Sequence, residues 1–478
     1  MKGGDAKGGQ PSGEEQAGGS VRISDDRYLT DYRGDKRVKS KKFGGEKDMK
    51  KLFVILLALG LMMAFSMPAA ATDMKISGSY YVQGFYDDNH NLVGSSWEGS
   101  SASSAWYGQR LRVNGNFQVA DGLKLVTRFD AMEKVWGQDV FPNSGATRES
   151  VDLSWERAYV QFATQYGNVY VGYMSGGAWG TVFNDSEGSV PRIKFVTSMD
   201  KWIFLALTEK GVEGDFGTAV TDADYDKYAV AAIYKFDWGQ VGLLEFYLPA
   251  RNYTEGGLPS GPANVWNNYL SPYFKGTFGD LYLEGEASIF FGEIEYDSPS
   301  ATNVDRKGYS AYLYAKYNLG GAYIGGQFGW VSGDDEDTKD KNEAGFPNND
   351  DWDPCLILWN YNLHKWMGNM GNLPWNGGGT GSQMQNAMLF QAFAGTTMDK
   401  LTVRGSLTYA KADEKPNDFI DDDYGIEFDI EAIYKIYDNL TYEVGFGYLW
   451  TGDYYKGDYS NADIDDNYLV VNKLTLKF

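Results

Sequence analysis

The chain has 478 residues, 16% of them aromatic and 59 of them glycine, and its 65 acidic and 43 basic residues give a net charge of −22. Such an acidic surface repels nucleic acid, so we expect no nucleic-acid partner. One cysteine excludes an intrachain disulfide, and two histidines leave little material for a His-based site, so we expect neither metal nor cofactor.

Residues 1–48 are polar, rich in glycine and mixed in charge, with nothing to bury. Such a composition predicts disorder. We interpret the stretch as a non-native upstream extension, produced by a start site placed too early, with Met49 as the real first residue.

Residues 49–71 have the composition of a signal peptide. Lys50 and Lys51 precede an apolar run from Leu52 to Phe65, and a small-x-small end formed by Ala69 and Ala71 follows it. The run is shorter than a membrane-spanning helix, which favours cleavage after Ala71 over an uncleaved anchor. Residues 1–71 hold 13 of the basic and 9 of the acidic residues, so residues 72–478 carry a net charge of about −26.

From Met74 to Phe478 apolar and polar residues alternate in segments of about 9–13 residues. Near the end, Tyr442, Val444, Phe446 and Tyr448 take every second position. A period of two predicts strands with one apolar face, because a helix would scatter these residues around its circumference. The class is therefore all-β, and no second domain is visible in residues 72–478.

The connections between these segments alternate in length. Transmembrane antiparallel β-barrels show this pattern, with short periplasmic turns and long extracellular loops, and they close because lipid offers the backbone no partner. Nine long loops and eight short turns predict 18 strands, with 16 as the lower bound of the count. The short turns fall near residues 121, 166, 200, 238, 279, 320, 399 and 438, and the long loops span 87–104, 133–150, 176–191, 209–224, 249–264, 295–307, 333–384, 412–422 and 452–465.

The longest loop, residues 333–384, begins acidic and then becomes aromatic, with Trp352, Trp359, Trp366 and Trp375. One interpretation is an aromatic platform for a sugar-like solute. We favour a surface loop packed over the barrel mouth or against a neighbouring copy.

The last segment, residues 468–478, resembles the assembly signal of outer-membrane barrels. Leu474, Leu476 and the terminal Phe478 share one face of an alternating strand. The resemblance implies recognition by the barrel-assembly machinery and a place in the outer membrane of a Gram-negative bacterium, surrounded by lipid and lipopolysaccharide.

A second resemblance covers residues 156–172. Arg157-Ala-Tyr-Val160 and the Gly, Val, Val and Gly at 167, 169, 171 and 172 look like the strand pair that leads into the inward-folding third loop of Gram-negative trimeric porins. Tyr173 departs from the pattern, because porins often carry Arg there. The resemblance implies a homotrimer and a channel for small polar solutes. Porins generally have 16 strands, so 18 would mean a variant or a maltoporin-like channel.

Alternation also predicts which side chains face the lumen. Basic residues occur on early strands and acidic residues on later ones, which predicts a field across a constriction, although lumen residues can be polar simply because they meet water. The candidate constriction loop is 176–191, whose polar tip would face the arginines. The predicted pore residues are Arg110, Arg112, Arg128 and Arg157 on one wall, Glu427, Asp429 and Glu431 on the other, and Asn184, Asp185 and Glu187 at the loop tip.

Common catalytic motifs, such as Gly-x-Ser-x-Gly and His-Glu-x-x-His, are missing from the sequence, so we expect no enzyme. The favoured function is passive diffusion of ions and small polar solutes with weak cation preference, because acids outnumber bases. Two alternatives stay open: a substrate-specific channel, and a barrel that sheathes a periplasmic electron carrier.

Overall fold

The computed structural model divides the chain into residues 1–70 and 71–478. The predicted upstream extension (1–48) and the signal peptide (49–71), with Ala69 and Ala71, lie outside the described residues. The described residues are 73–95, 103–137, 153–214, 224–253, 262–346, 350–371 and 379–478.

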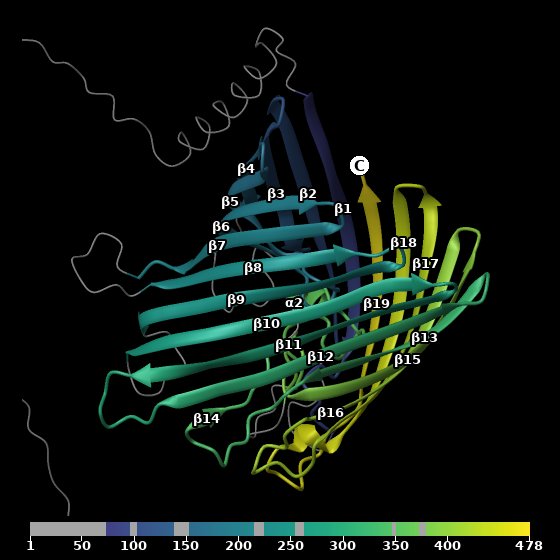
Figure 1. Ribbon diagram of the computed structural model, residues 1–478. Coiled ribbons are helices and arrows are strands. Elements are labelled where there is room, and N and C mark those ends of the chain that lie inside the picture. Colours follow the sequence, from purple (N-terminus) through teal and green to yellow (C-terminus); the bar gives the residue numbers. More distant parts are fainter. Residues whose placement is uncertain are drawn as a thin grey trace, which may run out of the picture. The chain divides into compact units, whose positions relative to one another are not determined.

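Residues 73–478 form strands in the order that alternation predicts (Figure 1). The strands are β1 (Asp73–Asp88), β2 (Ser104–Ala120), β3 (Leu123–Val135), β4 (Leu153–Thr164), β5 (Gly167–Gly177), β6 (Ser186–Met199), β7 (Trp202–Val212), β8 (Tyr225–Lys235), β9 (Gly239–Tyr253), β10 (Ala263–Phe278), β11 (Leu281–Tyr296), β12 (Val304–Asn318), β13 (Ala322–Val331), β14 (Lys341–Asn342), β15 (Ala387–Met398), β16 (Leu401–Lys411), β17 (Asp423–Tyr437), β18 (Leu440–Thr451) and β19 (Asn467–Lys477).

The sheet closes into a barrel, because the last strand pairs with the first. β19 and β1 are antiparallel over ten residue pairs, from Ser79 opposite Lys477 to Asp88 opposite Tyr468. The two-residue β14 pairs in parallel with β12 and lies within a loop, so it is not a wall strand. The other 18 strands make the wall, each antiparallel to both neighbours, which confirms the predicted closed barrel and its strand count.

The eight short turns and nine long connections also occur where predicted. The turn between β10 and β11 shows why glycine occurs in the short turns. Gly279 has a φ of 64°, a left-handed conformation that glycine adopts without strain. Several loops are shorter than predicted, as at 249–264, where β9 continues to Tyr253. The loop predicted at 176–191 covers only 178–185, because β5 continues to Gly177 and β6 starts at Ser186.

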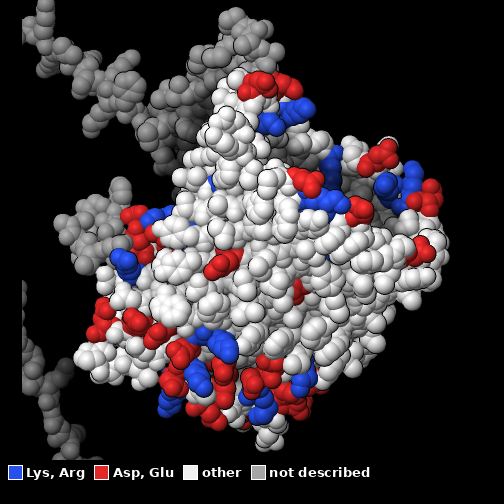
Figure 2. Space-filling model, in the orientation of Figure 1, with Lys and Arg blue, Asp and Glu red and all other residues white. Residues whose placement is uncertain are grey.

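The two faces of the wall differ sharply in exposure. On β17, Ile426, Phe428 and Ile430 are 42%, 37% and 43% exposed, whereas Glu427 and Asp429 between them are 0% and 1% exposed. Apolar residues therefore face outward, as in a barrel surrounded by hydrocarbon. Figure 2 shows the result on one side: charged side chains gather mostly near the two ends, and a broad, largely uncharged band lies between them.

Helical structure is scarce in the described part of the chain. It consists of α2 (Tyr361–Met367) and a single 3-10 turn, η1 (Asp453–Lys456). Neither is long and apolar enough to cross a membrane. Asn360 caps α2 by accepting a hydrogen bond from the backbone N–H of Leu363 at 2.9 Å.

Candidate functional site

Residues 350–371, which we name the inner segment, lie inside the barrel. The segment comes from the connection between β13 and β15 and contains α2, which Figure 1 shows within the ring of strands. Leu356, Ile357, Leu358 and Trp359 are all at most 7% exposed. They belong to one apolar cluster with inward side chains from widely separated strands, namely Tyr81, Phe85, Tyr312, Leu389, Tyr424, Leu449, Leu469 and Val471. Only a segment in the lumen can reach all of these strands.

This placement corrects the expectation of a surface loop over the barrel mouth. The physical reason is the run Leu356-Ile-Leu-Trp359, which follows an acidic stretch and must bury its apolar surface. Inward glycines on β18 make room for it, since a Cβ added at Gly445 or Gly447 would meet Leu356 at about 3 Å. Trp375 of the same loop lies outside the described residues.

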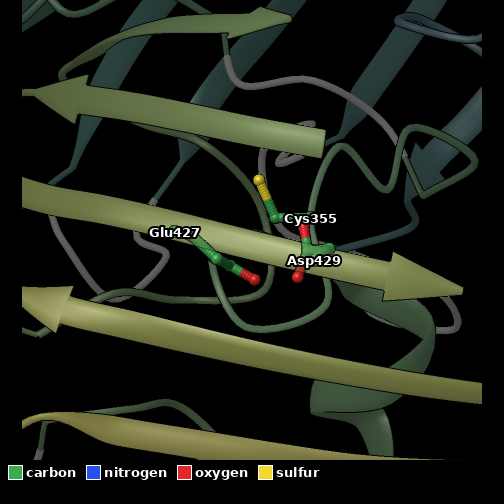
Figure 3. A group of neighbouring side chains, drawn as sticks. All are labelled: Cys355, Glu427 and Asp429. Atoms are coloured by element: carbon green, nitrogen blue, oxygen red, sulfur yellow. The ribbon is translucent and has the colours of Figure 1, made fainter. Parts of the chain in front are cut away.

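Glu427 anchors the inner segment to the wall. Its two carboxylate oxygens accept the backbone N–H groups of Ile357 and Leu358 at 2.6 and 2.8 Å. Two amide donors on one carboxylate form a strong, charge-assisted contact. Figure 3 shows Glu427 and Asp429 on the same strand, reaching toward the segment that carries Cys355.

This contact corrects the predicted role of two acidic residues. Glu427 and Asp429 do point inward, but the inner segment covers them, so they do not border open solvent as pore charges would. Glu431, the third predicted acid, is different. It pairs with Arg404 at 3.3 Å and lines a cavity of about 280 Å³ that also reaches Glu443 and Lys473.

Residues 178–185, the short inner loop, also fold inward. Glu286 of β11 holds this loop by accepting the backbone N–H of Thr181 at 2.8 Å and the side-chain amide of Asn184 at 2.5 Å. The indole N–H of Trp179 donates to the backbone oxygen of Ser271 on β10 at 3.2 Å. The loop is therefore fastened to β10 and β11.

The predicted positions of Asn184 and Asp185 opposite the arginines were wrong. Asn184 bonds Glu286, and Asp185 accepts the backbone N–H of Trp179 at 2.6 Å. The cause is the shorter loop, whose polar tip closes on its own backbone and on β11. Nothing in the spacing of these residues indicates that partner.

The two inward segments meet inside the barrel. Phe183 stacks on Tyr312 with ring centroids 5.4 Å apart, and its edge meets Trp352 at 5.1 Å. The backbone N–H of Asp351 donates to the backbone oxygen of Asp185 at 3.2 Å, which adds a polar contact between them. Together the short inner loop and the inner segment narrow the lumen.

A basic cluster faces these segments from the early strands. Arg112 donates to both carboxylate oxygens of Asp130, at 2.7 and 2.8 Å, and also contacts Glu187, which Arg128 contacts as well. Arg157 donates to the backbone oxygen of Glu187 at 2.9 Å. Arg112 and Arg128 thus meet at one acidic side chain that is 54% exposed, and Arg157 contacts the backbone of the same residue.

Three further charged residues join this cluster. Arg110 lies 3.7 Å from Glu133, and Lys365 of the inner segment lies 2.8 Å from the same carboxylate. Sequence analysis missed Lys365 and Glu133. Lys365 has no signal in the sequence, because only the fold of the inner segment brings it to β3.

The pKa of Asp185 responds to its position in the short inner loop. Burial raises it to about 7, although the N–H of Trp179 acts in the opposite direction by favouring the carboxylate. Burial also lowers the pKa of His364 in α2 to about 4, so this imidazole is neutral at neutral pH.

The raised pKa of Asp185 predicts a pH dependence of stability. A carboxyl group whose pKa rises on folding stabilises the barrel below its unfolded value of 3.8, and that contribution is lost as pH rises through about 7. In Asp185→Asn the amide oxygen keeps the bond to Trp179 and cannot ionise. We expect equal thermal midpoints near pH 4 and a midpoint several degrees higher in the variant near pH 8, measured by circular dichroism in detergent. His364 contributes equally to both proteins, and a constant difference across this range would contradict the assignment.

No protein-family model matches the chain, and no curated protein matches it. Solved structures do match. A BenF-like porin from Pseudomonas fluorescens is 12% identical, covering 84% of this chain and 99% of that chain, with a TM-score of 0.49. OccK8 (OprE) of Pseudomonas aeruginosa is 12% identical, with 84% and 98% covered and a TM-score of 0.49. The outer membrane protein OmpT of Vibrio cholerae is 11% identical, with 86% and 99% covered and a TM-score of 0.40.

Proposed function

We propose that the barrel is a channel of the Gram-negative outer membrane through which ions and small polar solutes diffuse passively. The observation that carries the proposal is the contrast between the two faces of the wall. Apolar side chains cover the outside, and charged and amide side chains occupy the inside, as on β2, where Arg110, Arg112, Asn114 and Asn116 alternate with Leu111, Val113 and Phe117. Such a wall separates hydrocarbon from a wet interior. The test is ion current across a planar bilayer that contains the purified barrel.

A substrate-specific channel is the second candidate, and the two inward segments favour it. They leave separate cavities along the lumen wall, one of about 280 Å³ beside Glu431 and one of about 240 Å³ beside Arg192 and Glu209. Both lie just below the roughly 300–1,000 Å³ of typical small-molecule pockets, so they would suit only a small solute. A specific channel saturates as solute concentration rises, whereas a general one does not, so liposome-swelling rates over a concentration series separate the two. The sheath for an electron carrier loses support, because the inner segment occupies the space that a protein partner would need.

The proposal includes a weak preference for cations. The loops at the long-loop end are rich in acid, as at Asp334–Asp337 and Asp421–Asp423, and an acidic mouth concentrates cations. The arginines near Glu187 oppose this effect further inside. The preference is therefore weak.

The charge balance near Glu187 predicts the effect of Arg112→Gln. Removing this positive charge leaves Asp130 and Glu187 less compensated, so cation preference should rise about two- to fivefold, equivalent to roughly 0.4–1 kcal/mol at the constriction. Reversal potentials under a KCl gradient measure the ratio. Lys75→Gln, outside the cluster, is the control. An anion-selective wild type would refute the cation preference. An unchanged cation-to-anion permeability ratio in Arg112→Gln would show that Arg112 does not border the path of the ions.

We also propose that the barrel forms a homotrimer and that its terminal residues Leu474, Leu476 and Phe478 serve the assembly machinery. Glu245 supports the homotrimer. It is exposed on the outer face of β9 between Leu243 and Tyr247. A carboxylate that faces hydrocarbon is energetically costly unless a neighbouring protein chain covers it. Native mass spectrometry in detergent should show three copies, and a monomer would refute the trimer.

At the barrel seam, where β19 meets β1, the terminal residue Phe478 exchanges two backbone hydrogen bonds with Gly78, at 2.8 and 3.0 Å.

A further inference from the structure

Two carboxylates are buried side by side under the inner segment, and no described residue gives them a cationic partner. Glu427 and Asp429 occupy successive inward positions of β17 and are 0% and 1% exposed. Within the described residues neither takes part in an ion pair, and Arg404 on the neighbouring strand pairs instead with Glu431. Two adjacent negative charges removed from water require a compensating positive charge or a proton.

Asp429 retains an unused acceptor in this site. Its Oδ2 accepts a hydrogen bond from Ser406 at 3.3 Å. Its Oδ1 is buried and accepts no hydrogen bond of good geometry from any described residue, although the backbone N–H of Leu356 lies nearby. Buried polar atoms in native proteins almost always have a partner, so this oxygen indicates that something binds there.

Cys355 brings a third ligating atom to the same place. Ligand atoms of Cys355, Glu427 and Asp429 all lie within 4.8 Å of one another (Figure 3). The thiol comes from the inner segment, two residues before the amide of Ile357 that Glu427 binds. Sequence spacing alone predicts no metal site here, because folding alone brings Cys355 to the two carboxylates, more than seventy residues later in the chain.

We propose that Cys355, Glu427 and Asp429 bind one divalent cation of the zinc class and that this ion fastens the inner segment to β17. A thiolate with two carboxylates suits zinc or cadmium, whereas calcium and magnesium prefer oxygen alone. Zinc ligands stand about 3.6 Å apart in a tetrahedron, so side-chain rotations must draw the three atoms together by up to about 1 Å. Binding releases the thiol proton, and the two positive charges of the metal then offset two of the three negative charges on the thiolate and the two carboxylates.

The proposed site borders a cavity. Cys355 and Leu356 line the cavity of about 280 Å³ that also contains Arg404, Glu431 and Lys473. Cys355 is itself only 4% exposed, so the site lies behind the wall of this cavity. The site is distinct from the basic cluster near Glu187 and does not depend on solute passage.

Cadmium titration of the purified barrel tests the proposal. Cys355 is the only cysteine of the chain, so a thiolate-to-cadmium charge-transfer band in the ultraviolet reports on this site alone. After chelator treatment we expect the band to saturate at one equivalent per barrel, and zinc to displace cadmium. Because the site is buried, the titration is done on the folded barrel and also with cadmium present during refolding.

Variants separate the three ligands from their surroundings. Cys355→Ser should abolish the band, and Asp429→Asn should weaken cadmium binding by more than about tenfold. Glu431→Gln, the next inward acid on β17, is the matched control and should bind as the wild type does. Absence of the band in the wild type under both conditions would overturn the proposal and leave one shared proton between the carboxyl groups as the explanation. Equal binding by wild type and Asp429→Asn would also overturn it.

Discussion

Replacing residues 350–371 by a short glycine–serine linker is expected to raise single-channel conductance several-fold. The inner segment packs against side chains from β1, β12, β15 and β17–β19, so it occupies much of the lumen cross-section. Its removal widens the water-filled path without changing the wall strands. Planar-bilayer recording measures the step size directly.

Glu427→Ala is the finer form of the same experiment. It leaves the N–H groups of Ile357 and Leu358 without their acceptor, which costs about 1–3 kcal/mol for each buried group. We expect larger and noisier current steps as the segment detaches. Glu431→Gln is the control, because Glu431 bonds Arg404 and not the inner segment. Wild-type steps from both the linker variant and Glu427→Ala would show that the segment does not limit the current.

Ile430→Arg is expected to have the largest effect on stability. Ile430 is 43% exposed on the outer face of β17, where the surroundings are hydrocarbon. An arginine near the middle of a bilayer destabilises such a barrel by about 2–4 kcal/mol. Denaturant unfolding in lipid vesicles, followed by tryptophan fluorescence, measures the loss.

Asn116→Arg is the matched control for the inner face. Asn116 is exposed and lies four residues after Arg112 on β2. The pairing of β2 with β1 has no bulge between these two residues, so both side chains point to the inner face. An arginine introduced there meets water, so we expect the free energy of unfolding to change by no more than about 0.5 kcal/mol. Similar losses in the two variants would mean that the outer face does not contact lipid.

The wall of this barrel could be predicted from sequence because its rules are local. Alternation of apolar and polar residues shows which side chains face lipid, as with Ile426, Phe428 and Ile430 between acidic neighbours. Turn residues such as Gly279 mark where strands end. Closure then follows from the need to pair every strand edge in hydrocarbon. No knowledge of distant contacts is required for any of these steps.

The interior could not be predicted in the same way, because it depends on contacts between distant segments. Alternation shows that Glu427 points inward, but not that the amides of Ile357 and Leu358 cover it. Alternation put Arg112 and Arg128 on one face, but it did not show that their shared partner Glu187 belongs to the start of β6 and not to a loop tip. The only sequence feature that pointed to the interior was the apolar run Leu356–Trp359. Because this run lies within a long and mostly polar loop, its burial was not predicted.

Ion current through single wild-type barrels in a planar lipid bilayer tests the central claim most directly. If a wet, charged lumen crosses the membrane inside the apolar outer face, insertion of folded barrels gives discrete and equal current steps. Folded barrels that insert, as judged by heat-modifiable migration and protection from protease, but pass no current above that of the bare bilayer would contradict a channel.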